Sequence, residues 1–250
     1  MPQRPLSLSL DLIARAHPHP VRDDPTALTL LTDDELGPGL ARALTRRPPG
    51  DDGLWVFGYG SLIWQPEFAF TERRTGTVRG YHRRFCLLQR RFRGSTERPG
   101  LVLALDRGGL CRGVAFRLPG DDPHVTLLPV WRREMRGNGY ESRWVVVDTA
   151  TGPVTALTFV VNRASDRYTG RLTEPEIADR IATGAGHLGP SAEYLFRTAE
   201  ACAREGILDE HLWTLQALVA ERLDAMARAD GAPQAPSRPA TSPSPQFTST

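Results

Sequence analysis

Trp55-Val-Phe-Gly-Tyr-Gly-Ser-Leu-Ile-Trp64 is a short apolar segment that runs into a sharp, glycine-rich turn. Trp55, Val56 and Phe57 predict a buried strand, which ends at Gly58-Tyr59-Gly60-Ser61. A glycine-rich turn after a strand exposes consecutive backbone N–H groups, and these form a concave site for a carboxylate or phosphate. Two glycines in a tight connection explain the same residues without any ligand. The turn by itself therefore leaves both interpretations open.

Further runs rich in Val, Leu and Phe, bounded by Gly, Pro or Asp, predict more strands along the chain. Together the predicted strands are Leu54–Tyr59, Gly76–Arg91, Leu101–Asp106, Cys111–Leu118, Arg143–Asp148 and Val154–Asn162. Asp106-Arg-Gly-Gly109 predicts a hairpin turn between two of them. Helical patterns follow at 173–183, 191–204 and 209–227, the first with Thr173 as N-cap. Strands first and helices last indicate an α+β fold, a small barrel or curved sheet with flanking helices.

Pro123–Met135 predicts one more helix, which ends before Gly137-Asn-Gly139. At 100° per residue its apolar side chains share one broad arc, formed by Val125, Leu127, Leu128, Val130, Trp131 and Met135. Glu134 falls inside this arc, so its carboxylate is expected to be desolvated, with a pKa raised towards the range of a general base. Pro129 would break a continuous helix, which makes the arc approximate. A solvated ion pair with a neighbouring arginine (Arg132, Arg133 or Arg136) is the competing interpretation.

Other polar residues near these motifs receive less weight. Glu67, Glu72 and Glu97 lie in polar segments and are predicted to be exposed. Glu193 lies on a predicted helix and faces either the core or a pocket edge. Ser61 has no base near it in sequence, so its hydroxyl is interpreted as a binding group and not as a nucleophile.

Composition limits the classes of function. A chain of 250 residues with 40% hydrophobic content can bury a substantial core and suggests one domain, at most two. Its formal net charge of +2 is too small to indicate a nucleic-acid partner. The chain contains no lysine, which excludes Schiff-base chemistry and a P-loop lysine. Cys86, Cys111 and Cys202 are isolated, so neither a disulfide framework nor a metal site is predicted, and no cofactor is expected.

The ends of the chain differ in composition from its middle. Residues 1–51 are rich in Pro, Asp and Arg and are interpreted as a partly ordered N-terminal extension, with a short helix between Asp33 and Arg46. The folded domain is predicted to cover 52–228, and the Pro/Ser/Thr-rich residues 229–250 are predicted to be disordered. Leu6–Ile13 is apolar but has no cleavage site, and no segment has the length of a membrane span, so a cytoplasmic location without a membrane partner is expected.

Five of these segments, in this order, resemble the ChaC-type γ-glutamylcyclotransferases. They are Val56–Trp64, Arg79-Gly-Tyr-His-Arg-Arg-Phe85, Arg93-Gly-Ser-Thr-Glu-Arg-Pro-Gly100, Trp131-Arg-Arg-Glu-Met135 with Gly139-Tyr140, and Glu193-Tyr-Leu195. The resemblance covers about Leu54 to Val219. It departs from the family pattern at Ser191, where an asparagine is frequent.

The resemblance implies a γ-glutamylcyclotransferase-like fold and cleavage of glutathione to 5-oxoproline and cysteinylglycine without a metal or cofactor. It assigns the catalytic carboxylate to Glu134. It assigns substrate binding to a cradling turn and two pocket-border segments, comprising Tyr59, Gly60, Ser61, Leu62, Gly94, Ser95 and Tyr194. Another γ-glutamyl amide or amine as substrate is the first alternative, motivated by Ser191 and the extension. A non-enzymatic anion-binding regulatory protein is the second.

Overall fold

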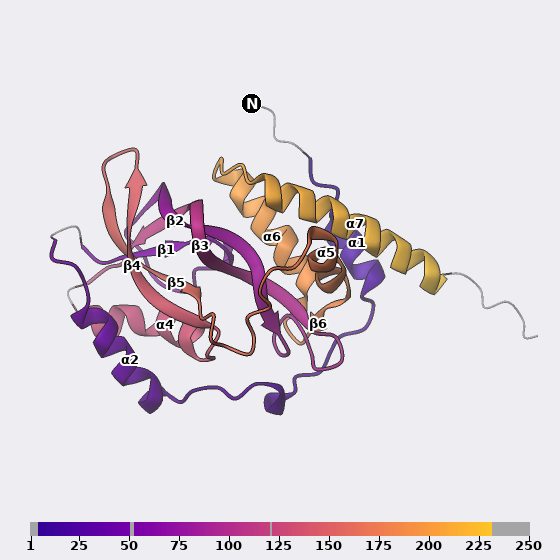
Figure 1. Ribbon diagram of the computed structural model, residues 1–250, viewed down its shortest axis with the longest axis horizontal. Helices are drawn as coiled ribbons and strands as arrows, with labels where there is room; N and C mark the ends of the chain where they lie inside the picture. Colours follow the sequence, from indigo (N-terminus) through magenta and orange to yellow (C-terminus); the bar gives the residue numbers. More distant parts are fainter. Residues whose placement is uncertain (1–4, 51–52, 121, 232–250) are drawn as a thin grey trace, which may run out of the picture.

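Five strands close into a barrel in the computed structural model, which describes residues 5–50, 53–120 and 122–231 (Figure 1). The order around the barrel is β1-β3-β2-β4-β5, and an additional pairing joins β3 to β5. The strands are β1 (Trp55–Gly58), β2 (Glu72–Gln89), β3 (Gly100–Arg117), β4 (Tyr140–Thr149) and β5 (Val154–Val161). Together with the helices around it, this barrel confirms the predicted α+β class.

Residues 106–109 do not form the predicted hairpin turn. They lie inside β3, which is one continuous strand paired with β2 from end to end. Gly108 and Gly109 have positive φ values of 98° and 70°, and the pairing register shifts between Arg79 and Tyr81 on the facing strand. The two glycines therefore make an irregularity inside a long strand, where the sequence pattern favoured a reversal of the chain.

β1 is buried on both of its faces, which explains its uninterrupted apolar sequence. It pairs in parallel with β5 and antiparallel with β3. Phe57 belongs to the main core of the barrel and helices, whereas Val56 belongs to a second core that lies against other helices. A strand covered on both faces does not alternate between apolar and polar residues.

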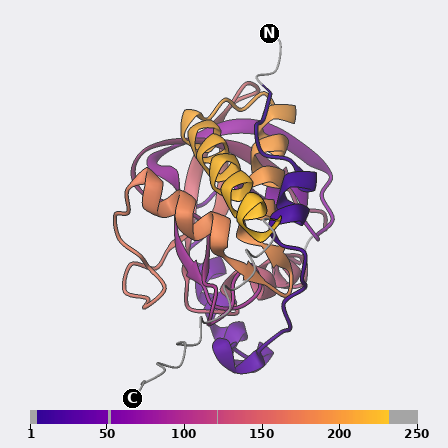
Figure 2. The same cartoon turned by 90° about the vertical axis from the view of Figure 1, so that its right-hand side faces the viewer.

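Four helices cover one side of the barrel, and Figure 2 shows them with α7 in yellow and α1 in indigo beside it. They are α1 (Leu10–Ala16), α5 (Glu174–Thr183), α6 (Ser191–Arg204) and α7 (Glu210–Gly231). Two-residue strands, β6 (Ala185–Gly186) and β7 (Gly189–Pro190), link α5 to α6. α1 was not predicted, although Leu8, Leu12 and Ile13 are all buried in the main core.

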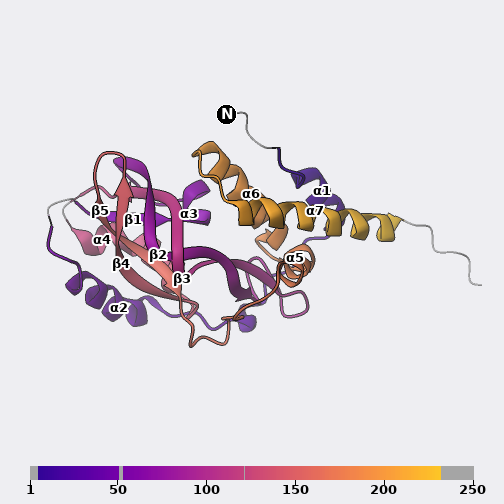
Figure 3. The same cartoon turned by 45° about the horizontal axis from the view of Figure 1, so that its top comes forward.

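The second core lies at the other side of the barrel, where α2 (Asp33–Thr45) packs against α4 (Pro123–Met135) (Figure 3). α4 continues through Pro129, and Leu127, Val130 and Trp131 are its buried residues. Val125 is 69% exposed, so its predicted place on the buried arc was wrong: burial begins only one turn into the helix.

Residues 17–32 connect α1 to α2 and run across the barrel from one helical layer to the other (Figure 1). We call this segment the strap; it contains one 3-10 turn, η1 (Pro25–Ala27). Asp23 holds its first half by a two-pronged ion pair with Arg91, at 2.8 and 2.7 Å. Asp33, just after the strap, makes the same contact with Arg132, at 2.9 and 2.8 Å. The predicted disordered tail, 229–250, lies outside the described residues from 232 onwards.

Candidate active site

The glycine-rich turn after β1 is shaped by two close approaches. A Cβ on Gly60 would lie 2.7 Å from the Tyr194 hydroxyl, and one on Gly58 would lie 2.9 Å from the Leu62 Cβ. Gly60 caps the short helix α3 (Ser61–Trp64), so the N–H groups of Ser61 and Leu62 belong to a first turn, which has no helical acceptors for them. Because Gly60 has no side chain, the Tyr194 hydroxyl of α6 packs directly against the backbone of the turn.

Arg83 of β2 fixes this turn from behind. Its Nε donates to the Tyr59 carbonyl at 2.6 Å, and its Nη2 donates to the Arg112 carbonyl at 2.6 Å. Its third contact is an ion pair with Asp209, before α7. The guanidinium is buried, so all of its hydrogen bonds are made to protein and it acts as a fixed support for Tyr59.

A cavity of about 550 Å³ opens beside the turn. Residues of α3, α4 and α6, the strap and the loops after β2 and β5 line it. Those used below are Leu28, Leu30, Ser61, Glu67, Gln89, Phe92, Arg93, Arg132, Arg133, Glu134, Arg136, Gly137, Tyr140, Arg167, Leu188 and Tyr194. A much smaller hollow adjoins it, lined also by Tyr59, Gly60 and Leu62. Glu134, Ser61, Tyr140 and Tyr194 line both spaces, which identifies their meeting point as the centre of the site.

Glu134 lies in the last turn of α4 with a side chain that is 13% exposed. Burial raises the pKa of this carboxyl above its ordinary value of 4.5, the Arg133 guanidinium acts to lower it, and Glu67 adds to the rise. The Arg133 Nε lies 3.3 Å from Glu134 Oε1, but the same guanidinium also binds Glu67 at 2.8 Å. The ion pair between Glu134 and a neighbouring arginine, which was the alternative to a buried carboxylate, is therefore present. Arg133 divides its guanidinium between Glu134 and Glu67, and the Glu134 carboxyl is largely desolvated.

Three tyrosines surround this carboxyl. The Tyr59 hydroxyl donates to the Phe159 carbonyl at 2.7 Å and the Tyr140 hydroxyl donates to the Leu103 carbonyl at 2.8 Å. Burial raises the pKa of both well above the ordinary value, and it raises the pKa of Tyr194 to about 12. All three hydroxyls are thus protonated at neutral pH, and Tyr194 presents its hydroxyl where the turn meets Glu134.

Gly94 and Ser95 do not line the cavity. Ser95 Oγ accepts from the Arg98 N–H at 3.0 Å inside the loop after β2, and a Cβ on Gly94 would collide with the Gln89 carbonyl. Their neighbours Phe92 and Arg93 face the cavity instead, where Arg93 Nη1 lies 3.1 Å from Glu193 Oε2. These two predicted residues shape the loop that delivers Phe92 and Arg93.

The other predicted carboxylates are distributed as follows. Glu97 and Glu67 are exposed, although Glu67 lines the cavity mouth. Glu72 is half-buried, in contrast to the exposed position predicted for it, because it pairs with Arg74 at 2.6 Å. Glu193 lies at the pocket edge, bound by Arg93 and Arg197.

Sequence reasoning missed the residues that enter the cavity from outside the motifs. Leu28 and Leu30 come from the strap, and Arg167 comes from the loop after β5. No periodicity or motif connects these segments to Glu134 in the sequence. Tyr140 appeared in the sequence analysis only within the Gly139-Tyr140 motif of the family resemblance, with no role assigned to it.

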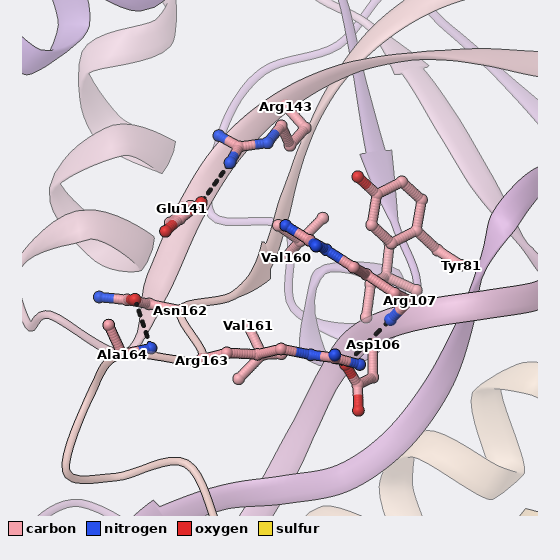
Figure 4. Close-up of a pocket in the computed structure, with 11 residues that line it drawn as sticks. Tyr81, Asp106, Arg107, Glu141, Arg143, Val160, Val161, Asn162, Arg163 and Ala164 are labelled. Carbon is pink, nitrogen blue, oxygen red and sulfur yellow. Dashed lines mark hydrogen bonds and ion pairs between the residues drawn. The ribbon is translucent and has the colours of Figure 1, made fainter. Parts of the chain in front are cut away.

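A separate hollow of about 100 Å³ lies between β3, β4 and the loop after β5 (Figure 4). It shares no lining residue with the cavity around Glu134. Asp106 at its base accepts hydrogen bonds from Arg163 Nε at 2.7 Å, Tyr168 Oη at 3.0 Å and the Arg107 N–H at 2.9 Å. Although burial acts to raise its pKa, these contacts bring the pKa of Asp106 below the ordinary value. The carboxylate is saturated, and its role is structural.

Within residues 5–50, 53–120 and 122–231, no group of three or more His, Cys, Asp or Glu side chains is arranged to hold a metal ion. In the same residues no helix has both the length and the apolar character needed to cross a bilayer.

The fold is that of the γ-glutamylcyclotransferases. A crystal structure of the yeast γ-glutamylcyclotransferase specific to glutathione superposes with a TM-score of 0.61 at 22% identity, covering 70% of this chain and 97% of that one. The closed barrel and its flanking helices thus define the fold class.

The sequence comparisons define the family. Residues 54–222 match the family model of the ChaC-like proteins, and the chain belongs to that family. The glutathione-specific γ-glutamylcyclotransferase of Escherichia coli (strain K12) is 38% identical over 185 residues, 73% of this chain and 79% of that protein. The glutathione-specific γ-glutamylcyclotransferase 1 of Rattus norvegicus is 38% identical over 187 residues, 70% of this chain and 84% of that protein.

Proposed function

We propose that this protein is a glutathione-specific γ-glutamylcyclotransferase that releases 5-oxoproline and cysteinylglycine. The observation that carries the proposal is the buried Glu134 carboxyl, with its raised pKa, at the junction of a cavity and a glycine-rich turn. The names of the relatives in E. coli and R. norvegicus support the choice of substrate. A cytoplasmic location remains a prediction.

The reaction is an intramolecular aminolysis. The α-amino nitrogen of the γ-glutamyl unit attacks the γ-carbonyl carbon, closing a five-membered lactam, and the bond to the cysteine nitrogen breaks. Because nucleophile and electrophile belong to one molecule, holding them in the right geometry can supply about 7–11 kcal/mol of the barrier. The protein therefore has to fix one conformation of the substrate and help to move protons from the attacking nitrogen to the departing one.

Glu134 is the group proposed to take part in this proton transfer. An α-amine has a reference pKa of about 8 and is mostly protonated at neutral pH, so it needs a base before it can attack. A carboxylate whose pKa is raised by burial accepts a proton more readily than an exposed one. As the lactam closes, the attacking nitrogen loses a second proton. One of the two protons passes through Glu134 to the departing cysteine nitrogen, which leaves as a neutral amine, and the other goes to solvent.

Two roles remain open for the turn at Tyr59, Gly60, Ser61 and Leu62. The N–H groups at the start of α3 can hold the α-carboxylate of the substrate, or they can stabilise the oxyanion that forms on the γ-carbonyl oxygen. The Ser61 and Tyr194 hydroxyls are proposed as hydrogen-bonding partners of the substrate at the same place. Gly94 and Ser95 enter the proposal as supports of the Phe92–Arg93 loop.

The alternative substrates have less support. Ser191, whose departure from the family pattern motivated them, is fully buried, and its Oγ bonds with the Leu101 N–H at 3.1 Å. It ties α6 to β3 and does not line the cavity. A protein that only binds anions gains nothing from a desolvated carboxyl in its pocket, which speaks against the regulatory alternative.

A substrate panel tests the proposal. Purified protein is incubated with glutathione, γ-glutamyl-alanine and a γ-glutamylamine, and 5-oxoproline is measured for each. The proposal predicts the highest kcat/KM for glutathione. A preference for either of the other two donors would assign a different substrate to the same reaction, and no 5-oxoproline from any donor would favour the binding protein.

A further inference from the structure

Arg167 is a buried guanidinium at the edge of the cavity. It follows β5, is 7% exposed, and lines both the 550 Å³ cavity and a neighbouring hollow beneath the strap. Leu28 of the strap lines the same two spaces. The two residues therefore stand at the far end of the cavity, where it continues under the strap.

The partners of Arg167 within the described residues are neutral. The Arg167 Nε donates to the Leu88 carbonyl at 3.0 Å. The Arg167 Nη2 faces the Gln89 side-chain amide, whose oxygen accepts from it when the amide is turned towards the guanidinium. No carboxylate of the described residues lies within 4.0 Å of Arg167. The other cavity arginines each have at least one within that distance. Arg93 has Glu193, Arg132 and Arg136 have Asp33, and Arg133 has Glu67 and Glu134.

A buried cation without an anion is an unfavourable arrangement. Burial lowers the pKa of Arg167 below its ordinary value, and the Tyr140 and Asp166 side chains act only from a distance to raise it. A guanidinium nevertheless stays charged, because its pKa begins far above neutrality. The energetic cost of this burial is offset if a ligand brings a carboxylate to it.

Two glycines leave room for the guanidinium beside the end of α4. A Cβ on Gly137 would lie 2.9 Å from Arg167 Nη1 and 3.6 Å from Leu28 Cδ2, and a Cβ on Gly139 would lie 3.1 Å from Nη1. Gly137 lines the cavity and follows Glu134 by three residues. The space between Arg167 and the strap is thus continuous with the site at which the γ-glutamyl unit reacts.

We propose that Arg167 binds the terminal carboxylate of the departing amine, with Leu28 of the strap as the apolar wall beside it. This inference rests on the proposed function: in glutathione the departing amine is cysteinylglycine, which ends in a carboxylate. The subsite would make the protein select γ-glutamyl peptides with a free terminal carboxylate over γ-glutamylamines, which have none.

A purely structural role for Arg167 makes a different prediction. The residue also ties its loop to β2, because its own carbonyl accepts from the Leu88 N–H at 2.8 Å. Loss of that support would lower turnover of every substrate equally. Loss of a carboxylate contact lowers turnover only of substrates that carry the carboxylate.

The test compares glutathione with its glycine monoethyl ester, for the wild type, Arg167→Gln and Arg167→Lys. We expect the wild type to favour glutathione by about 10- to 100-fold in kcat/KM, the range of a charge-assisted hydrogen bond. Arg167→Gln should lower the value for glutathione to that for the ester and leave the ester unchanged. Arg167→Lys, which keeps the charge, should retain part of the preference.

Arg79→Gln is the matched control, because Arg79 pairs with Asp148 at 3.1 Å and lines neither the large cavity nor the hollow beneath the strap. It should keep the full preference. Equal turnover of both substrates by the wild type would overturn the inference even if Arg167→Gln failed to fold, and would leave the proposed function intact. Equal losses on both substrates in Arg167→Gln would also overturn it. If the wild type releases 5-oxoproline from neither, the proposed function itself fails.

Discussion

Glu134 combines a buried position with a partly shared ion pair, and this combination has a consequence for stability. A carboxyl whose pKa is higher in the folded than in the unfolded state binds its proton more tightly when folded. Its contribution to stability is therefore present below the ordinary pKa of 4.5 and is lost as the pH rises through the raised pKa. At neutral pH the charged Glu134 makes folding less favourable.

The first prediction follows from that sign. Glu134→Gln should be more stable than the wild type at pH 7, by about 0.5–2 kcal/mol, the range of stabilising changes at strained functional sites. The difference should disappear below about pH 4.5, where both side chains are neutral. Urea unfolding at the two pH values measures it. A variant less stable than the wild type at pH 7 would mean that the Arg133 pair outweighs desolvation.

The second prediction concerns the acid limb of the rate profile. A general base works only when deprotonated, so kcat/KM should fall as the pH drops through the raised pKa of Glu134. Glu67 helps to raise that pKa and also binds Arg133. Glu67→Gln should therefore move the acid limb to lower pH.

Glu141→Gln is the control for that profile, because Glu141 pairs with Arg143 on β4, away from Glu134. It should leave the limb in place. If the acid limb does not move in Glu67→Gln, the pH dependence of kcat/KM does not come from Glu134.

At the level of single residues, the sequence predicted Glu134 because two independent signals met there, a helical arc and a family motif. It did not predict Arg167 or Leu28, since each belongs to a segment with no motif and reaches the cavity only through the fold. Gly94 and Ser95 are the opposite case. A motif residue can be needed for the shape of a loop without facing the pocket.

Among the elements, the contact between the turn after β1 and α6 depends on Gly60 and Tyr194. An alanine Cβ at Gly60 would lie 2.7 Å from the Tyr194 hydroxyl, so Gly60→Ala should destabilise the fold. Tyr194→Phe removes that oxygen. The third prediction is that Gly60→Ala lowers the free energy of unfolding by less in the Tyr194→Phe variant than in the wild type. Unfolding of the single and double variants in guanidinium chloride should give a coupling energy of about 0.5–3 kcal/mol between the two substitutions.

Gly37→Ala in α2 is the control for this cycle. A Cβ there meets nothing within 4 Å, so the change should be neutral or stabilising and additive with Tyr194→Phe. Additive costs for Gly60→Ala and Tyr194→Phe would contradict the close approach.

The strands and helices were predicted more reliably than their connections. The helix at Glu174–Thr183 has its N-cap at Thr173 as expected, because the Thr173–Glu176 capping box is a local signal. The reversal expected at Asp106–Gly109 was wrong, because two glycines serve a strand irregularity as well as they serve a turn. Only the pairing of β3 with β2, which depends on residues distant in the sequence, distinguishes a strand irregularity from a turn.

For the whole molecule, the N-terminal segment is part of the main core although the family match begins at residue 54. α1 packs against α7, and the Leu8 N–H donates to Gln216 Oε1 at 2.9 Å. The sequence did not predict this helix, because seven residues give too short a periodic pattern to distinguish from a loop. The strap that follows is thereby held at both ends.

The fourth prediction tests this integration. Leu12 is 4% exposed, so Leu12→Ala should lower the free energy of unfolding by about 2–5 kcal/mol. Leu10 on the same helix is 44% exposed, and Leu10→Ala should change it by less than about 0.5 kcal/mol. Chemical denaturation followed by tryptophan fluorescence measures both. Equal, small effects would show that α1 does not contribute to the core in solution.

The central claim is that Glu134 is the base of a glutathione cyclotransferase, and one measurement addresses it directly. Wild type and Glu134→Gln are incubated with glutathione, and 5-oxoproline is quantified, with the fold of each checked by thermal unfolding. We predict product from the wild type and a loss of about 10²- to 10⁴-fold in the folded variant. Equal amounts of product from the two proteins would contradict the assignment of the base, and no product from either would contradict the assignment of the substrate.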